Sequence, residues 1–420
     1  MGRTHFLGLA GVLGLAATFA ACSASSEGGD GFDNGDGTGG SASGAGGSPS
    51  DDGDMSADDD FDPTGGGSST GGDPTCVTDQ AVDDDLDGLS EDQGDCNDCD
   101  PNVHPGSIEV IATADGGGGA GGGSGAGGAP AAADEDCDGM VDNVPPPCDT
   151  GLLVDDADPN SGAKAVDLCQ AADGMKWGVI AAGYVRADGV PTSASLATGI
   201  LDNFGPNVAV QGGERMLALS SGYARRPTDP NYCGGISCSV AGIGTPPPGF
   251  PQDTAGCSGL TNINDDAALQ VAIRTPKNAT GYSFNFKFYS QEYPEWVCTS
   301  FNDQFISLVA PPPMGSINGN ISFDSANNPV SVNVAFFDVC PGCPAGEAEL
   351  LGTGFDYDAG ATSWLKTTAP VTGGDEVTIR WAIWDTGDTG WDSTVLVDNF
   401  QWVATGGTPS VGTEPIPDPK

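Results

Sequence analysis

The stretch Tyr-Ser-Phe-Asn-Phe-Lys-Phe, residues 282–288, decides the fold, because aromatic residues recur at every second position. Alternation of this kind places apolar side chains on one face of a β-strand and polar side chains on the other. The stretches 330–336, 377–383 and 395–401 alternate in the same way, and clusters of Gly, Pro, Asn and Asp separate them. The pattern predicts a mainly β fold, an antiparallel, jelly-roll-like β-sandwich with half-buried sheets, over about residues 150–404.

Charge and glycine are distributed unevenly along the 420 residues. The chain has 59 acidic and 13 basic residues, a net charge of −46, and 67 glycines. Residues 23–160 contain 33 of the acidic residues and no Lys or Arg. Such a segment cannot bury a conventional core. It also excludes nucleic acid as a partner, because phosphate binding needs clustered basic side chains. Divalent cations are the partners that this charge favours.

The N-terminus has the pattern of an exported lipoprotein. Arg3 precedes an apolar run, residues 6–21, that is short for a bilayer span but has the length of a signal-peptide core. Phe19-Ala20-Ala21-Cys22 resembles a bacterial lipobox. The resemblance implies a signal peptide over 1–21, lipidation of Cys22 and, because Ser23 follows, a surface-exposed protein anchored in the cell outer membrane. Ordinary secretion, with Cys22 inside a cleaved peptide, is the alternative.

The cysteines predict disulfides. Thirteen cysteines less Cys22 leave twelve, an even number that suits an oxidising compartment. Two pairs have CxxC spacing, starting at Cys96 and Cys340, which leaves metal or redox roles as alternatives.

Two flanking segments contain little that is apolar. Residues 22–75 predict a disordered Gly/Ser/Asp linker, and residues 405–420 a disordered tail.

Residues 76–148 form a predicted acidic module with two D-x-D-x-D-G loops. In each loop, positions 1, 3, 5 and 9 carry carboxylates, position 7 offers a carbonyl oxygen, and Gly at position 6 permits a sharp turn. No Glu occupies position 12 of the first loop and no helical pattern flanks it, so it is not an EF-hand. Oxygen donors favour Ca²⁺, with a merely solvated acidic run as the alternative. The candidate metal ligands are Asp83, Asp85, Asp87, Leu89, Glu91, Asp134, Asp136, Asp138, Met140 and Asp142.

These loops, together with Gly94-Asp95-Cys96, Pro105-Gly106 and Glu109, resemble a metal-binding repeat of Gram-negative cell surfaces. Some members of that family are associated with copper. This chain lacks the cysteine that usually follows the Glu, and it carries a Gly/Ala-rich insertion over 116–133. The resemblance therefore implies a bound cation, with Ca²⁺ favoured over copper. His104 is expected to be a turn residue rather than a copper ligand, because a copper site usually has several nitrogen or sulfur donors.

Several motifs in the β-rich region resemble the choice-of-anchor L domain of exported bacterial proteins. They are Lys176-Trp177-Gly178-Val179, the stretches 213–220 and 289–295, Phe301-Asn302-Asp303-Gln304-Phe305, the stretch 383–388 and Trp391-Asp392-Ser393. The resemblance covers about residues 150–404. It implies a cell-surface protein whose anchor varies between members and to which no general activity is attached. Here the anchor would be the N-terminal lipid.

Side chains near the predicted strand ends form a second candidate metal site. Its members are Glu292, Asn302, Asp303, Asp385, Asp388 and Asp392. If their loops meet, these residues would supply an oxygen cage for Ca²⁺; turn capping is the alternative. Glu292 and Asp303 could instead be the acid and base of a glycosidase. A Ser-His-Asp triad is excluded, because the region contains no histidine.

The sequence thus predicts a non-enzymatic outer-membrane lipoprotein that displays a Ca²⁺-stabilised β-sandwich for adhesion or ligand binding. Its expected partners are divalent cations, outer-membrane lipid and a glycan or other surface polymer. An extracellular carbohydrate-active hydrolase and a metal-scavenging surface protein are the alternatives. Four tryptophans could stack on sugar rings, with core packing as the alternative role: Trp296, Trp364, Trp384 and Trp391.

Overall fold

The computed structural model describes residues 79–111, 132–174, 176–257, 259–334, 336–356 and 358–416. The predicted signal peptide, Cys22, the predicted linker 22–75, the start of the acidic module and most of the Gly/Ala-rich insertion lie outside the described residues. Within the described ranges, no helix is both long enough and apolar enough to cross a membrane.

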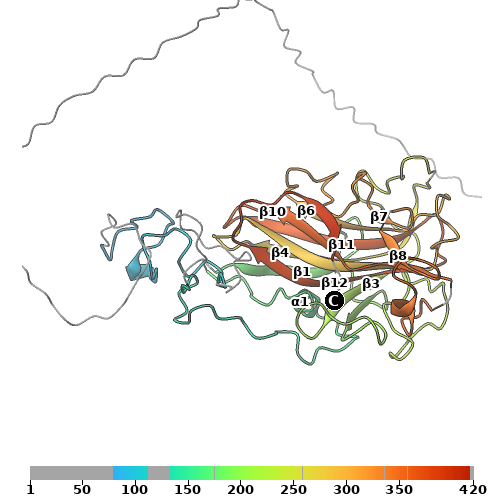
Figure 1. Ribbon diagram of the computed structural model, residues 1–420, viewed down its shortest axis with the longest axis horizontal. Coiled ribbons are helices and arrows are strands. Elements are labelled where there is room, and N and C mark those ends of the chain that lie inside the picture. Colours follow the sequence, from blue (N-terminus) through green and yellow to red (C-terminus); the bar gives the residue numbers. More distant parts are fainter. Residues whose placement is uncertain are drawn as a thin grey trace, which may run out of the picture. The chain divides into compact units, whose positions relative to one another are not determined.

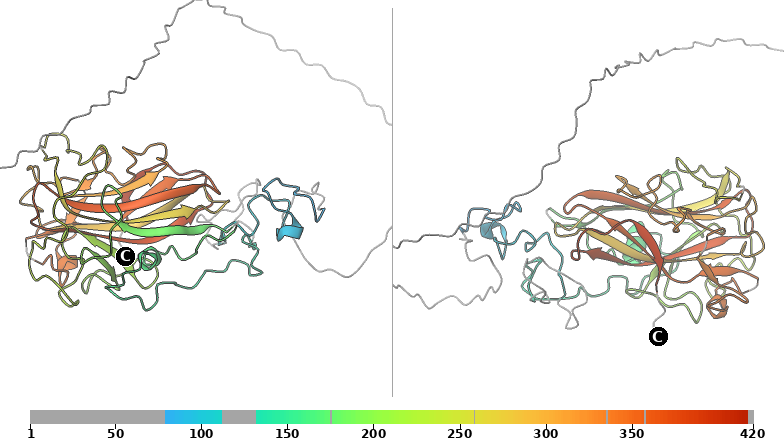
Figure 2. Two further views of the ribbon diagram at one scale, coloured as in Figure 1. Left: turned by 180° about the vertical axis from the view of Figure 1, so that it is seen from behind. Right: turned by 45° about the horizontal axis from the view of Figure 1, so that its top comes forward.

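Two sheets form a β-sandwich (Figures 1 and 2). One has five strands in the order β1-β4-β11-β6-β7, and the other has the main order β13-β10-β5-β12-β3-β2, with β9 pairing β5 and β8 pairing β9. All pairings between these strands are antiparallel, so the predicted fold class is confirmed. The strands are β1 Gly178–Val185, β2 Thr198–Leu201, β3 Met216–Ser220, β4 Ile263–Arg274, β5 Gly281–Ser290, β6 Gln304–Ala310, β7 Val330–Ser331, β8 Phe337–Val339, β9 Gly360–Thr362, β10 Leu365–Pro370, β11 Glu376–Thr386, β12 Ser393–Val403 and β13 Gly412–Pro415.

Strand β5 places its aromatic side chains in the core between the sheets. The Phe284 ring lies 5.6 Å, centroid to centroid, from that of Trp381 on β11. The Phe286 ring lies 5.0 Å from that of Phe305 on β6. Edge-to-face and tilted aromatic contacts add to the free energy gained by burying apolar area. The alternation in the sequence therefore encodes the contact between the two sheets.

The polar face of β5 is also buried, which differs from the half-buried sheet that alternation predicts. Ser283, Asn285 and Lys287 are all buried, and the Lys287 ammonium pairs with the Glu349 carboxylate. Glu349 belongs to the 3₁₀ helix η2, Ala348–Leu350, in a long connection that covers this face of the sheet. The alternation in the sequence predicts which face of a strand is polar. Whether that polar face is buried depends on which loops pack over it.

Two predictions from pattern fail locally. The stretch 330–336 is not one strand: β7 ends at Ser331, where the Val334 amide donates to the Ser331 carbonyl and turns the chain out of the sheet. The tail over 405–420 was expected to be disordered, yet β13 pairs with the outer edge of β10, and the hydroxyls of Thr413 and Thr367 lie 2.8 Å apart. An open sheet edge offers unpaired backbone groups that a following segment can bind.

Short helices and disulfides complete the fold. Helix α1, Pro159–Lys164, begins after Asp158, whose carboxylate accepts the Asn160 amide at 2.9 Å. The 3₁₀ helix η1 spans Glu91–Gln93.

The described disulfides confirm the cysteine prediction, and Cys99 is disulfide-bonded as well. They join Cys96 to Cys137, Cys148 to Cys169, Cys233 to Cys238, Cys257 to Cys298 and Cys340 to Cys343.

Candidate cation-binding site

The first acidic loop, residues 83–91, and the second acidic loop, residues 134–142, share left-handed residues at positions 4 and 6, but differ at position 9, where Asp142 is left-handed and Glu91 begins a 3₁₀ helix. Position 4 is left-handed in both, with φ 68° at Leu86 and 55° at Cys137. Position 6 is the glycine that the spacing predicts, with φ 99° at Gly88 and 92° at Gly139. A left-handed residue with a side chain is uncommon, so its recurrence indicates that the D-x-D-x-D-G spacing itself imposes this turn.

Backbone amides orient the carboxylates of the first loop. The amide of Asp87 donates to Asp85 Oδ1 at 3.0 Å, that of Gly88 to Asp83 Oδ2 at 2.9 Å, and that of Leu89 to Asp87 Oδ1 at 2.7 Å. Each bond engages one carboxylate oxygen and leaves the other free to bind elsewhere. Asp83 Oδ1, Asp85 Oδ2 and Asp87 Oδ2 are buried and accept no hydrogen bond from any described residue.

The second loop repeats this hydrogen-bond pattern position by position. The amide of Asp138 donates to Asp136 Oδ1 at 3.1 Å, that of Gly139 to Asp134 Oδ2 at 2.9 Å, and that of Met140 to Asp138 Oδ1 at 2.8 Å. The two loops are therefore structural repeats as well as sequence repeats.

Five carboxylates converge at the first loop. Ligand oxygens of Asp83, Asp85 and Asp87 lie within 4.8 Å of one another, and those of Asp85, Asp95 and Asp98 form a second group of this kind. Asp95 and Asp98 follow the loop in sequence and are buried. Neither was predicted as a ligand, although Asp95 stands in the Gly-Asp-Cys motif that carries the family resemblance.

Glu91, the predicted ligand at position 9, also faces inward. Its Oε2 atom is buried, and the carboxyl group lies next to that of Asp98. Burial, together with the neighbouring carboxylates, raises the pKa of Asp85 to about 6 and that of Asp95 to about 7. Desolvation disfavours the charged form of a carboxyl group unless an opposite charge compensates it. A hard cation would supply this opposite charge. Ca²⁺, for example, usually binds 6 to 8 oxygen ligands.

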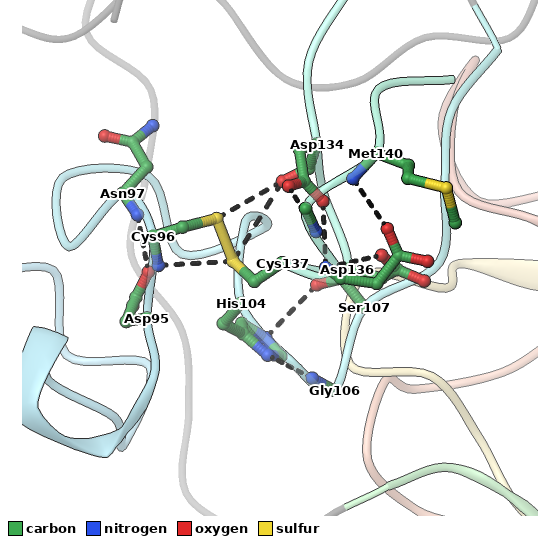
Figure 3. The surroundings of a disulfide bond; sticks show 12 residues. Asp95, Cys96, Asn97, His104, Gly106, Ser107, Asp134, Asp136, Cys137 and Met140 are labelled. Atoms are coloured by element: carbon green, nitrogen blue, oxygen red, sulfur yellow. Dashed lines mark hydrogen bonds between the residues drawn. A yellow bond between two sulfur atoms is a disulfide. The ribbon is translucent and has the colours of Figure 1, made fainter. Parts of the chain in front are cut away.

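His104 is buried next to the first loop, and Figure 3 shows its ring with Gly106 and Ser107. Its Nδ1 accepts the Gly106 amide at 2.8 Å, so the ring hydrogen of the neutral form is on Nε2. Nε2 is 3.3 Å from the Ser107 hydroxyl and 3.4 Å from Asp87 Oδ2. Burial lowers the pKa of His104, which favours the neutral ring. The two ring nitrogens contact the Gly106 amide and the Ser107 hydroxyl, and Nε2 lies near Asp87 Oδ2 without a hydrogen bond between them.

Glu109 closes the second loop. Its carboxylate oxygen lies within 4.8 Å of ligand oxygens of Asp134 and Asp136. Glu109 Oε1 accepts the Asp136 amide at 3.3 Å and Oε2 the Asp142 amide at 2.8 Å. Burial raises the pKa of Glu109 to about 7. Like Asp95, Glu109 lies outside the predicted ligand list but inside the motif that carries the resemblance.

The second loop is more open than the first. Asp138 and Met140, both predicted ligands, are exposed. Asp138 Oδ2 accepts the side-chain amide of Asn143 at 2.7 Å, so both oxygens of this carboxylate already have partners. The structure thus groups Asp134 and Asp136 with Glu109 and turns Asp138 away from them.

A disulfide joins the two halves of the acidic module (Figure 3). Cys137 occupies position 4 of the second loop, and its partner Cys96 directly follows Asp95. The His104 amide donates to the Glu135 carbonyl at 2.9 Å and adds a second link. Each loop is therefore held by contacts that are distant in sequence.

Residues at the end of β4 bind the acidic module. Lys277 Nζ donates to the carbonyl of Asp87 at 2.7 Å, and the Lys277 amide donates to the carbonyl of Gly106 at 3.0 Å. The Asn278 side chain binds both backbone groups of Ile108, at 3.0 and 2.9 Å. The first loop is thereby connected to the sandwich through its own backbone.

The predicted ligands of the second candidate site are mostly buried, but among the described residues they do not form a group of three carboxylates whose oxygens lie within 4.8 Å of one another. Glu292, Asn302, Asp303, Asp385 and Asp392 are buried, whereas Asp388 is exposed. Burial is the largest cause of a raised pKa in all four buried carboxyl groups. The pKa of Glu292 rises to about 10, and those of Asp303 and Asp392 rise to about 7. The pKa of Asp385 rises well above its ordinary value. The Asn302 side-chain oxygen accepts the Asn333 backbone amide at 3.2 Å.

Tryptophan packing resolves only part of the sugar-stacking hypothesis. Trp384 is fully buried in the core. Trp296, Trp364 and Trp391 are half-buried. The rings of Trp296 and Trp391 pack edge to face with centroids 5.7 Å apart, close to the second candidate site in sequence.

The comparisons with known proteins concern the sandwich. A family model, the choice-of-anchor L domain, matches residues 219–400. The sandwich contains a choice-of-anchor L domain. It runs from the end of β3 to β12, so β1, β2 and β13 lie outside the matched range and complete the sheet edges. The domain indicates a cell-surface protein, and its family is not a family of enzymes. No curated protein matches the chain.

Proposed function

We propose that the protein is an outer-membrane lipoprotein, anchored through Cys22, that displays a Ca²⁺-stabilised β-sandwich for adhesion or ligand binding and catalyses no reaction. The choice-of-anchor L domain supports display at the cell surface. One observation carries the calcium part of the proposal: buried carboxylate oxygens of the first loop and Asp95 converge without hydrogen-bond partners among the described residues.

Donor chemistry favours Ca²⁺ over copper or zinc. The converging donors are carboxylate oxygens, which are ligands of hard cations. The adjacent nitrogen donor, His104, uses both ring nitrogens in other contacts. The nearby sulfur atoms of Cys96 and Cys137 form a disulfide and are not available as thiolates. These contacts weaken the metal-scavenging alternative for soft metals.

Cation binding would stiffen the connection between the module and the sandwich. Asp87 of the first loop makes both kinds of contact. Its side-chain carboxylate belongs to the converging group, and its backbone carbonyl accepts a hydrogen bond from Lys277 Nζ. A cation that orders the loop therefore also fixes the atoms that Lys277 binds. Ordering a loop costs conformational entropy, and the free energy of cation binding can offset that cost.

The hydrolase alternative is less well supported. Glu292 and Asp303, its candidate acid and base, are 2% and 0% exposed. A glycosidase holds a sugar and a water molecule between its two carboxyl groups. Carboxyl groups buried to this extent do not contact such a substrate without rearrangement of the surrounding loops.

Calcium titration of the full mature chain tests the proposal. Calorimetry should detect Ca²⁺ binding at micromolar to millimolar concentration, and Asp85→Asn should weaken the first-loop affinity about 100-fold, because it removes a buried anionic ligand. Asp84→Asn is the matched control, since Asp84 is exposed and lies outside the converging group. Equal affinities for wild type and Asp85→Asn would overturn the calcium part.

Fractionation and binding assays test the remaining parts. Cys22→Ser should move the protein from the membrane fraction to the soluble fraction. A glycan and surface-polymer array probed with the full chain, with Ca²⁺ and with chelator, tests ligand binding. Binding that chelator weakens supports a calcium-dependent adhesin. Glycan turnover that Glu292→Gln abolishes would instead favour the hydrolase.

A further inference from the structure

Asp85 belongs to two groups of carboxylates at once. In the loop group, ligand oxygens of Asp83, Asp85 and Asp87 lie within 4.8 Å of one another. In what we call the adjoining group, the same holds for Asp85, Asp95 and Asp98. Among the described residues, no single group contains all five carboxylates. Two oxygens bound to one Ca²⁺ are at most about 5 Å apart, since each lies about 2.3–2.6 Å from the ion. Each group therefore has the size of one ion's ligand shell, and the five carboxylates together exceed it.

Asp95 points to a ligand within the adjoining group. The residue is 4% exposed. Its Oδ1 accepts the Asn97 amide at 2.8 Å, whereas its Oδ2 is buried and accepts no hydrogen bond from a described residue. Buried polar atoms nearly always have partners, and an exception requires an explanation such as an unrecorded ion. The adjoining group therefore has its own evidence for a ligand, independent of the D-x-D-x-D-G loop.

Backbone contacts hold the adjoining group beside the first loop. Asp98 is completely buried, and its Oδ1 accepts the amide of Asp84 at 2.9 Å. Asp84 stands in sequence between two members of the loop group. The Asp95 amide donates to the carbonyl of Ser90, inside the first loop, at 3.2 Å. The two groups are therefore parts of one structure that shares Asp85.

The charge at the first loop exceeds what one ion compensates. The five carboxylates of the two groups carry five negative charges when they are ionised. The Lys277 ammonium, which donates to the carbonyl of Asp87, supplies one positive charge. One Ca²⁺ and Lys277 compensate three of the five charges, whereas two Ca²⁺ and Lys277 compensate all five. Ionised carboxylates that are buried without an opposite charge are costly, so charge balance favours two ions.

We propose that the first loop is half of a two-ion Ca²⁺ site, in which Asp83 and Asp87 bind one ion, Asp95 and Asp98 bind the other, and Asp85 bridges them. Asp85 Oδ1 accepts the Asp87 amide, whereas its Oδ2 is buried and accepts no hydrogen bond from a described residue. Oδ2 is therefore available as the bridging atom. This inference rests on the proposed calcium binding at the first loop and adds a second ion to it.

Counting ions tests the proposal in the full mature chain with the second loop weakened by Asp134→Asn and Asp136→Asn. Calorimetry and native mass spectrometry should find two Ca²⁺ per chain in this background. Adding Asp95→Asn should remove one of them, through a loss of about 100-fold in its affinity, because a buried anionic ligand is lost. Adding Asp85→Asn should weaken both ions. Asp92→Asn is the matched control and should retain both, since Asp92 is exposed and lies outside the two groups.

The count also separates this inference from the proposed function. One Ca²⁺ in the background, weakened by Asp85→Asn, would overturn the two-ion site and leave calcium binding at the first loop intact. No Ca²⁺ in the background would overturn both. A count of two that Asp95→Asn leaves unchanged, with both affinities unaltered, would show that the adjoining group binds no ion.

A second readout tests whether the two ions share a ligand. Mn²⁺ also prefers oxygen ligands, and two metal ions in one site lie about 3.5–4 Å apart. Two Mn²⁺ bridged by Asp85 should therefore be magnetically coupled, with an electron paramagnetic resonance spectrum that differs from that of isolated Mn²⁺. Asp95→Asn should restore the isolated spectrum, and Asp83→Asn, on the other side of the bridge, should do the same, so the result does not depend on one variant. Uncoupled spectra from the background with two Mn²⁺ bound would contradict the shared ligand.

Discussion

The two acidic loops share a sequence pattern, left-handed residues at positions 4 and 6 and a set of hydrogen bonds, yet their surroundings differ. In the first loop the Asp87 side chain is 3% exposed, and the buried carboxylate of Asp95 adds to the group. In the second loop Asp138 and Met140 are exposed, and the added carboxylate, Glu109, is only half-buried. The first loop therefore resembles a closed site and the second an open one.

This difference separates two requirements of a cation site. Local spacing fixes the loop conformation, because each carboxylate caps an amide two to five residues away. Affinity depends also on how many ligands converge and how rigidly they are held. We therefore expect the first loop to bind Ca²⁺ more tightly than the second.

The largest effect should come from removing the Cys96–Cys137 disulfide, which spans 41 residues in sequence. Replacing both cysteines by serine should lower the free energy of unfolding of the module by about 4 kcal/mol, because a long chain segment regains freedom in the unfolded state. Ca²⁺ binding should weaken more at the second loop, which contains Cys137. Calorimetric melting with chelator measures the loss. Replacing Cys340 and Cys343, only 3 residues apart, is the control and should cost less; equal losses would contradict the prediction.

The two carboxylates outside the loops give the next largest effect. Asp95→Asn should weaken Ca²⁺ binding at the first loop about 100-fold, because Asp95 is buried among the ligands. Glu109→Gln should weaken the second loop only about tenfold, because solvent screens a half-buried ligand. Titration calorimetry on each single variant provides both numbers. The reverse order of the two effects would show that enclosure does not set the affinity.

pH should affect both loops over one common range. Folded-state burial raises the pKa of Asp85 to about 6 and those of Asp95 and Glu109 to about 7, above the unfolded values of about 4. In chelator the folded module holds these protons, so its stability should be greatest below about pH 4 and should fall as pH rises to about 7. Ca²⁺ must displace the protons, so the stabilisation by Ca²⁺ should grow over the same range. Melting temperatures in chelator that rise with pH would contradict this.

The smallest effect should come from the His104 side chain, which contacts Asp87 of the first loop, whereas only the His104 backbone contacts the second loop. His104→Asn removes the ring whose Nε2 lies 3.4 Å from Asp87 Oδ2, and it should weaken Ca²⁺ binding at the first loop a few-fold, because Asp87 loses a buried polar neighbour. His104→Gln can place an amide donor near the position of Nε2 and should have a smaller effect. The second loop is an internal control in both variants. An equal loss at both loops would indicate that His104 supports the module as a whole.

Local pattern predicted much of this protein. Alternation in 282–288 correctly predicted β5 and the aromatic core, and the D-x-D-x-D-G spacing correctly predicted the left-handed glycines Gly88 and Gly139. The pattern failed in 330–336, where a turn ends β7, and in the tail, where β13 adds to a sheet edge. In both places a contact outside the segment decides the outcome, and local spacing carries no information about that contact.

The sequence by itself determined the aromatic face of β5 and the turns of the two loops, and it carries the export pattern, because each depends on neighbours within a few residues. Only the tertiary structure decided that Asp95 and Glu109 join the loops, that Asp138 is exposed and that Asp385 is completely buried. These outcomes depend on which distant segments pack together and exclude water. The energetic cost or benefit of a carboxylate is set by that exclusion, since desolvation determines whether a proton or a cation must accompany it.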